Sequence, residues 1–189
     1  MDTFNHFKAV LGIIFGLGIA QLIKGTVRFV QHPKREKPYW IHLLWCLYIF
    51  LLMVHFWWWE YNLHNLKTWI FPKYFFLIIY TGMYYLLCAL LMPEDVKDYG
   101  GEYKQYFFRR KNWFFGTLAL TFAADVVDTL IKGNDYYLIH HIEYPIRAAF
   151  HIALCLIAMK VSNKRFHGML VSVFIVYELS YILRLFFVE

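Results

Sequence analysis

Six runs of mainly apolar residues, each long enough to cross a lipid bilayer, constrain this 189-residue chain more than any other feature. The hydrocarbon core of a bilayer is about 30 Å thick, so a spanning helix needs roughly 17–25 such residues. Six helices of this length use about 120 residues and leave the rest for short connections. The runs predict transmembrane helices at residues 8–30, 39–61, 70–92, 113–132, 145–161 and 166–187.

The composition excludes the main alternatives to a membrane protein. Apolar residues make up 60% of the chain and charged residues 17%, whereas soluble domains average about 45–50% and about 25%. A disordered chain needs the opposite balance. Because five comparable runs follow the first, we expect no cleaved leader sequence. The sequence therefore predicts an all-α integral membrane protein, with the lipid bilayer as its main partner.

The distribution of positive charge argues against nucleic acid as a partner and predicts an orientation. The net charge is +6, but the basic residues lie in short clusters between the apolar runs, without a nucleic-acid-binding motif. Twelve of the 19 Lys and Arg residues fall on one side of the predicted membrane and six on the other. By the positive-inside rule, the first side is cytoplasmic and both termini lie outside.

Three sequence matches, in the same order in each half, predict an internal duplication. The matched segments are 22–25 with 130–133, 42–47 with 151–156, and the pair Tyr80 and Tyr84 with the pair Tyr177 and Tyr181. Because each half holds three spans, the second copy would enter the membrane from the opposite face, as an inverted repeat. The predicted units are a first half at 1–95, a cytoplasmic interfacial linker at 96–112 and a second half at 113–189. Chance matches between apolar segments are the alternative.

Ionisable residues inside the predicted spans are the main candidates for function. A charge at the centre of a bilayer costs about 2.5 kcal/mol or more, so such residues normally face the bundle interior and have partners. On span 113–132, polar residues recur every three or four positions and form one stripe: Thr117, Thr121, Asp125, Asp128 and Lys132. A second stripe, on and just before span 145–161, comprises Tyr144, Arg147, His151 and Cys155.

These stripes predict specific pairs if the last three helices are neighbours. Asp125 or Asp128 can pair with Arg147, whose planar guanidinium can bind two carboxylates. Glu178 on the last span can meet His151 or Arg147. One interpretation is a buried ion-pair network that only fixes helix register. The other is a binding site for an anion, a proton or a polar solute, in which the acids and the imidazole exchange protons.

Four further residues are secondary candidates: Lys24, His42, Tyr181 and Arg184. Lys24 extends a face of small residues, Gly12, Gly16 and Ala20, which we expect to pack against another helix. His42 shares a face with Glu60, five helical turns away. Glu60 follows three tryptophans, and we expect it at the membrane interface.

The sequence predicts no metal, haem or other cofactor. His140 and His141 stand alone, without a Cys-x-x-Cys motif or other ligands at close spacing. No phosphate-binding loop or hydrolase motif occurs, which makes an enzyme the less favoured class. The three cysteines, Cys46, Cys88 and Cys155, lie within spans and are expected to be free thiols.

Several segments resemble a group of bacterial six-pass inner-membrane proteins without a characterised activity. The segments are 55–60, 109–116, 125–128, 165–168 and 177–180. The resemblance covers most of the chain and implies a multi-pass protein of the bacterial inner membrane. It implies no activity, cofactor or catalytic residue.

These observations favour a channel- or transporter-like site for a small ion or polar solute, in a homo-oligomer. The expected site residues are Asp125, Asp128, Arg147, His151 and Glu178. One alternative is a non-enzymatic membrane partner or effector that uses its basic loops, including Arg109, Arg110 and Lys111, to bind another protein or perturb the bilayer. Another is a lipid head-group enzyme with His151 as its base.

Overall fold

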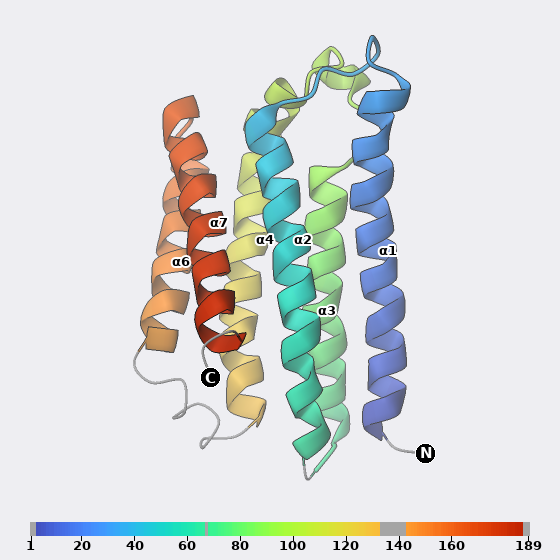
Figure 1. The fold of residues 1–189 in the computed structure, drawn as a ribbon, viewed down its shortest axis with the longest axis vertical. Coiled ribbons are helices and arrows are strands. Elements are labelled where there is room, and N and C mark those ends of the chain that lie inside the picture. Colours follow the sequence, from blue (N-terminus) through green and yellow to red (C-terminus); the bar gives the residue numbers. More distant parts are fainter. Residues whose placement is uncertain (1–2, 67, 133–142, 187–189) are drawn as a thin grey trace.

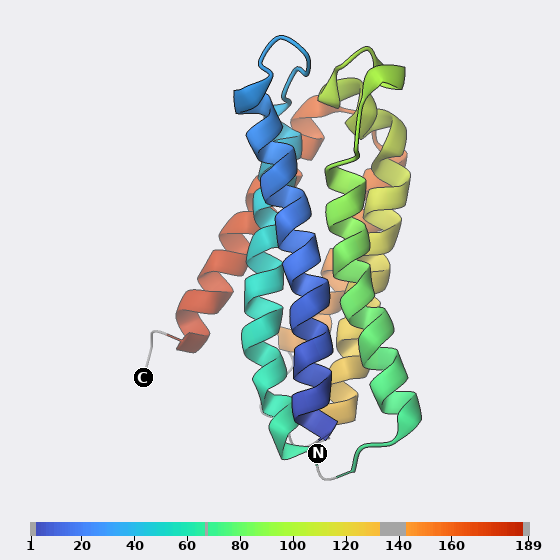
Figure 2. The same ribbon diagram turned by 90° about the vertical axis from the view of Figure 1, so that its right-hand side faces the viewer.

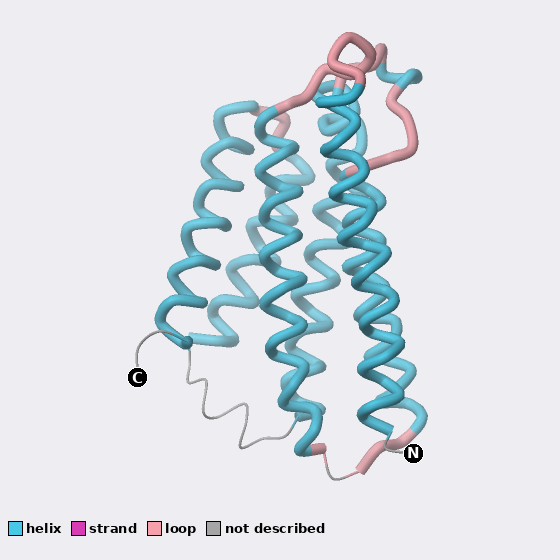
Figure 3. The backbone as a smooth tube through the Cα atoms, turned by 45° about the vertical axis from the view of Figure 1, so that its right-hand side comes forward, coloured by secondary structure: helices cyan, strands magenta, loops and turns pink. Residues whose placement is uncertain are grey.

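A computed structural model describes residues 3–66, 68–132 and 143–186 of the chain. Regular secondary structure in these ranges is helical, apart from one isolated bridge between Lys37 and Glu102 (Figure 3). The long helices are α1 (Thr3–Gln31), α2 (Trp40–Trp59), α3 (Phe71–Leu91), α4 (Tyr103–Lys132), α6 (Glu143–Lys160) and α7 (Lys164–Phe186). Short 3-10 helices follow α2 (η1, Glu60–Asn65) and α3 (η2, Lys97–Tyr99).

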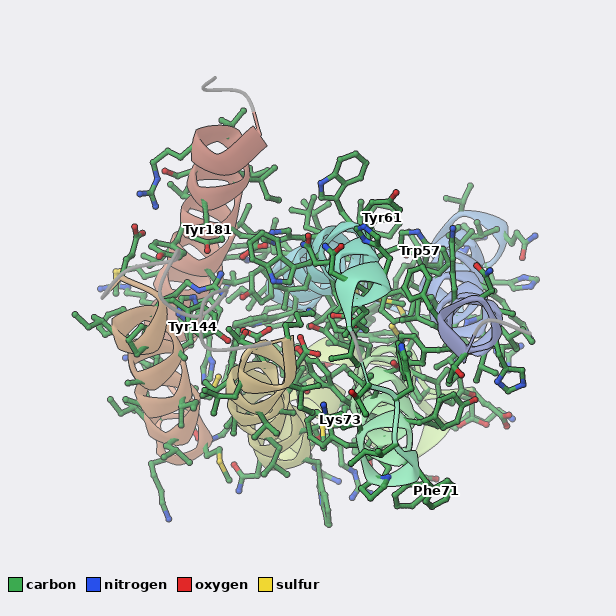
Figure 4. All side chains as sticks on the ribbon, turned by 90° about the horizontal axis from the view of Figure 1, so that it is seen from below. Trp57, Tyr61, Phe71, Lys73, Tyr144 and Tyr181 are labelled. Atoms are coloured by element: carbon green, nitrogen blue, oxygen red, sulfur yellow. The ribbon has the colours of Figure 1, made fainter. Side chains whose placement is uncertain are left out.

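The long helices run up and down in alternation and form one bundle (Figure 1). α1 packs mainly on α3, α3 also packs on α4, and α4 packs on α6, while α2 contacts α3 and α7. Seen from below, α1 lies on one flank and α6 with α7 on the other (Figure 4). α7 is inclined to the other helices (Figure 2). α1 begins and α7 ends toward the same, lower end of Figure 1.

Five of the helices are long and apolar enough to cross a membrane: α1, α2 with η1, α3, α4 and α7. The predicted fifth span, 145–161, corresponds to α6, which has only 18 residues and carries the charged side chains of Glu143, Arg147 and Lys160. Six spans thus remain a prediction. α4 begins at Tyr103, well before its expected start at 113, so the second part of the predicted linker is helical.

The outer faces of the bundle are apolar. Large exposed side chains on five helices include Ile13, Leu17, Val54, Phe75, Leu120 and Val173. Soluble monomers rarely expose continuous apolar surface of this kind, whereas lipid chains solvate it readily. The ionisable side chains between the helices are instead buried, as described below. This distribution supports a membrane environment.

The two predicted halves pack differently. In the first half, α1 lies mainly against α3 and has few contacts with α2. In the second half, α4 lies mainly against α6, the helix that would correspond to α2. An inverted repeat would give equivalent contacts in both halves, so the helix packing does not support the duplication, which stays a prediction. Gly133, the last residue of one matched segment, lies outside the described residues.

At the end of the bundle that carries most of the basic residues, hydrogen bonds join the connecting segments to one another. Arg28 near the end of α1 donates to the Pro93 carbonyl (2.7 Å) and to the Tyr103 hydroxyl (2.9 Å). Lys37 Nζ lies 2.9 Å from Glu102 Oε1, and this hydrogen bond lowers the pKa of that carboxyl. All three connections at this end belong to the side that the sequence predicts to be cytoplasmic.

The small-residue face predicted to pack helices is largely unused within the chain. A Cβ on Gly12 would touch the Trp57 ring at 3.2 Å, but one on Gly16 would have no neighbour within 4 Å. Ala20 is exposed. The close approaches occur instead at Gly18, where a Cβ would lie 2.9 Å from Met53, and at Gly25.

Gly25 sets the distance between α1 and the end of α3, which gives a direct test of this packing. A Cβ at Gly25 would lie within 2.5–2.7 Å of three Met92 side-chain atoms, including its Cβ, which cannot move without the backbone. We expect Gly25→Ala to destabilise the protein by about 1–3 kcal/mol. Gly16→Ala is the matched control and should be neutral or stabilising by up to about 1 kcal/mol. Thermal unfolding in detergent measures both, and equal effects would contradict the proposed packing.

Candidate functional site

Asp125 is the centre of a polar cluster between α3, α4 and α6. The Tyr80 hydroxyl donates to its Oδ1 (3.1 Å) and the Tyr144 hydroxyl to its Oδ2 (2.9 Å). Arg147 Nη2 lies 3.4 Å from the same Oδ2. Thr129, one turn further along α4, donates to the Asp125 carbonyl and lies 2.8 Å from the Tyr144 hydroxyl. The predicted pair of Asp125 with Arg147 is thus present.

Two tyrosine rings hold the guanidinium of Arg147. Its Cζ lies 4.4 Å from the centroid of the Tyr181 ring and 5.3 Å from that of Tyr144. Figure 4 labels both tyrosines, on neighbouring helices of the same flank. A cation over an aromatic face is stabilised by about 0.5–2 kcal/mol, more where water is excluded. The Arg147 side chain is 14% exposed, so the ring contacts and Asp125 replace most of its hydration.

A second cluster joins the end of α2 to the end of α4. Lys132 Nζ lies 2.6 Å from Glu60 Oε1 and 2.5 Å from Asp128 Oδ2. All three side chains are at most 4% exposed. Glu60 thus faces α4 in the protein interior, while its expected position at the level of the membrane interface stays a prediction. Asp128 pairs with Lys132 on its own helix rather than with Arg147.

Glu178 of α7 pairs across the bundle with His55 of α2. His55 Nδ1 lies 2.5 Å from Glu178 Oε1, and the Glu178 side chain is 2% exposed. The predicted partner His151 instead donates from Nδ1 to the Arg147 carbonyl of its own helix (2.8 Å) and packs against the Phe174 ring. The expected pair of Glu178 with His151 is thus wrong, because α7 packs against α2 more closely than against α6.

A small cavity of about 40 Å³ lies between the Asp125 and Glu178 clusters. Its polar lining comprises His55, Tyr84, Thr121, Asp125, Arg147 and Tyr181. One water molecule needs about 10–15 Å³ of such volume and two to four polar partners. The cavity can hold a few waters or one small ion. We call the cavity, the two clusters beside it and the neighbouring Lys132 cluster, which does not line the cavity, the polar chamber.

An aromatic layer separates the polar chamber from the basic end of the bundle. The buried Trp45 ring makes edge-to-face contacts, with centroids 5.2–5.5 Å apart, with four other rings: Tyr48, Phe114, Phe115 and Phe174. These rings come from α2, α4 and α7, which line the cavity together with α3 and α6. The polar chamber therefore lies nearer the lower end of Figure 1.

Of the secondary candidates, only Tyr181 reaches the polar chamber. Lys24 is exposed on α1. His42 is buried near the opposite end of α2 and bonds a main-chain carbonyl of α3. Arg184 pairs with Glu143 at 2.7 Å, with both side chains about half exposed. Of the five main candidates, His151 lies beside the chamber without an ion-pair partner among the described residues.

Sequence reasoning missed three partners: Glu60, His55 and Tyr80. Lys132 is included in the predicted polar stripe, but its pair with Asp128 is not predicted. The two residues are four positions apart, which is the spacing of an ion pair within a helix. Glu60 follows α2 directly, and no periodicity shows how a connection after a helix turns. The three cysteines are buried and free, as predicted. His140 and His141 lie outside the described residues.

These features are those of a helical membrane protein with a charged interior. No protein-family model, curated protein or solved structure matches the chain. The resemblance to a bacterial six-pass group thus stays a prediction.

Removing Arg147 should leave Asp125 without its cation in a partly buried site, where its side chain is 21% exposed. We expect Arg147→Met to destabilise the protein by about 3–5 kcal/mol. Adding Asp125→Asn should recover part of this loss, because the unpaired charge is then gone. Arg184→Met, at the half-exposed pair, should cost less than about 1 kcal/mol. Unfolding in detergent with increasing denaturant measures all four proteins, and equal costs for the two arginine variants would rule out the buried pair.

Proposed function

We propose that the polar chamber binds a small ion or polar solute, in a channel- or transporter-like role. The observation that carries this proposal is the cavity between Asp125, Arg147 and His55. Apolar side chains packed in place of these ionisable groups would often give a protein of equal or greater stability. Acidic, basic and hydroxyl groups all line the cavity. A bound guest could therefore exchange its water shell for fixed protein groups.

The charges around the chamber favour a cationic guest over an anionic one. The chamber holds four carboxyl groups, Glu60, Asp125, Asp128 and Glu178, and two permanent cations, Lys132 and Arg147. A protonated His55 would supply a third positive charge. With all acids ionised the chamber is negative, and a buried excess charge is costly without a counterion. A proton or a small cation supplies that counterion.

The aromatic layer favours a transporter over an open pore. A guest that enters the chamber from the lower end meets Trp45, Phe115 and Phe174 before it can reach the basic end. Transport across the membrane would require these rings, or the inclined helix α7, to move. Access would then alternate between the two ends, as in transporters with a central site.

The proposal also covers the number of spans, the membrane, the orientation and the oligomeric state. We propose a six-pass protein of the bacterial inner membrane, with its basic end in the cytoplasm and both termini outside. The cluster of basic residues at one end supports this orientation. A homo-oligomer is supported by the outward face of α1, where Gly16 and Ala20 have no helix packed against them in a single chain.

The geometry supports the two alternatives less well. A lipid head-group enzyme needs an open lateral cleft at Asp128 and Glu178, but these side chains are 1% and 2% exposed. If this chain acted by binding another protein, its basic loops would be exposed to that protein. Lys111, however, is buried and donates to the Ala158 and Met159 carbonyls at the end of α6. Arg109 and Arg110 are exposed beside the Tyr99 ring, and so are other basic loop residues such as Lys34 and Lys164, so this alternative keeps some support.

Reconstitution into liposomes tests the proposal. The vesicles contain a pH-sensitive dye and receive gradients of ammonium, potassium or sodium chloride. We expect one of these cations to produce a flux above that of protein-free vesicles, with at least a tenfold reduction in Asp125→Asn and in Glu178→Gln. Arg184→Gln, outside the chamber, should retain the wild-type rate. Absence of flux in the wild type, or unchanged flux in both chamber variants, would contradict the proposed function.

A further inference from the structure

The carboxyl groups of Glu60 and Asp128 share one ammonium group but use only half of their oxygens for it. Glu60 Oε1 and Asp128 Oδ2 accept from Lys132 Nζ. The other two oxygens, Glu60 Oε2 and Asp128 Oδ1, are buried and have no hydrogen-bond donor in the structure. Both carboxyls contact the same ammonium, at 2.6 and 2.5 Å, so they lie close to each other. Each orphaned oxygen is an acceptor, so neither can satisfy the other without an added proton.

We propose that Glu60 and Asp128 hold one exchangeable proton between them, and that this pair is the proton-binding site of the chamber. A proton on either carboxyl converts one acceptor into a donor, which can then bond the neighbouring carboxylate. It also leaves one carboxylate for one ammonium, so the cluster becomes neutral. Two ionised carboxylates beside Lys132 would instead leave a net negative charge in a buried site. This inference rests on the proposed function, because it names the proton as the ion that the chamber exchanges.

The groups around the pair allow the proton to leave and return. On α4, Asp125 lies one turn before Asp128, and Lys132 lies one turn after it. Tyr80 and Tyr84 of α3 are the nearest phenols, and the Tyr80 hydroxyl links to Asp125. On the other side, Glu60 lines a groove of about 460 Å³ between the starts of α1 and η1, together with Lys8. This groove borders Glu60, while Asp128 does not line it.

The structure favours a proton over a metal cation at this position. The described residues contain no group of three or more His, Cys, Asp or Glu side chains that could hold a metal ion. The space beside the carboxyls is already taken by Lys132 Nζ, which lies within 2.6 Å of both. A second full positive charge there would face the ammonium directly. A shared proton adds no such repulsion, because it neutralises a carboxyl within a hydrogen bond.

Infrared spectroscopy of the full chain in lipid nanodiscs tests the proposal. A buried protonated carboxyl gives a carbonyl stretch separate from that of carboxylates, and the band moves when the exchangeable proton becomes deuterium. We expect this band in the wild type at pH 7, and its loss as the pH is raised. It should be absent in Glu60→Gln and in Asp128→Asn. The control Glu102→Gln, at the opposite end, should leave the band intact. A wild type without the band at pH 7, or the band persisting in both chamber variants, would overturn the proposal.

Stability provides a second readout, because an amide resembles a protonated carboxyl. Either Glu60→Gln or Asp128→Asn alone should keep the unfolding temperature near that of the wild type, since one carboxylate still faces Lys132. The double variant should be clearly less stable than the two single variants predict, because the ammonium then loses both of these carboxylates. Additive effects would contradict a shared proton. Neither measurement depends on flux, so a wild type with the band but without flux would refute the proposed function and leave the proton site standing.

Discussion

The low dielectric of a bilayer requires each ionisable side chain inside it to find a partner, and the arrangement of α4 follows from that requirement. Its polar face carries Asp125, Asp128 and Lys132, and their partners come from other elements: Arg147 from α6 and Glu60 from the segment after α2. Each pair therefore fixes the rotation of one helix against another. The interactions that make the chamber polar are the same ones that set the register of the bundle.

The chamber has two properties that a purely structural network would not need. A network that only fixes register is most stable when every buried polar atom has a partner and no space remains. Here a cavity of about 40 Å³ lies beside Arg147, and one oxygen on each of Glu60 and Asp128 has no donor. The cavity and these two acceptors are the features on which the proposed binding role rests.

The sequence predicts much of this structure, and its errors have physical causes. Apolar runs of bilayer length locate the long helices, because the pattern is long and uninterrupted, although α4 begins ten residues before its apolar run. The three-to-four spacing on α4 places Asp125 and Asp128 on the interior face, and a nearby cation on the next helix makes Arg147 an obvious partner. Spacing within one helix cannot show which distant helix lies opposite it, however. Glu178 therefore faces His55 and not His151, since α7 packs against α2. The direction of Glu60 depends on a turn after α2, which no periodicity describes.

The position of the chamber along the membrane normal has an electrical consequence. Asp125 is seven residues from the end of α4, which corresponds to about 10 Å along a helix, or roughly a third of the hydrocarbon thickness. A monovalent cation that reached Asp125 from the lower end would cross only that fraction of the transmembrane voltage. Its affinity would then change by about 0.8 kcal/mol per 100 mV, a third of the value for a full crossing.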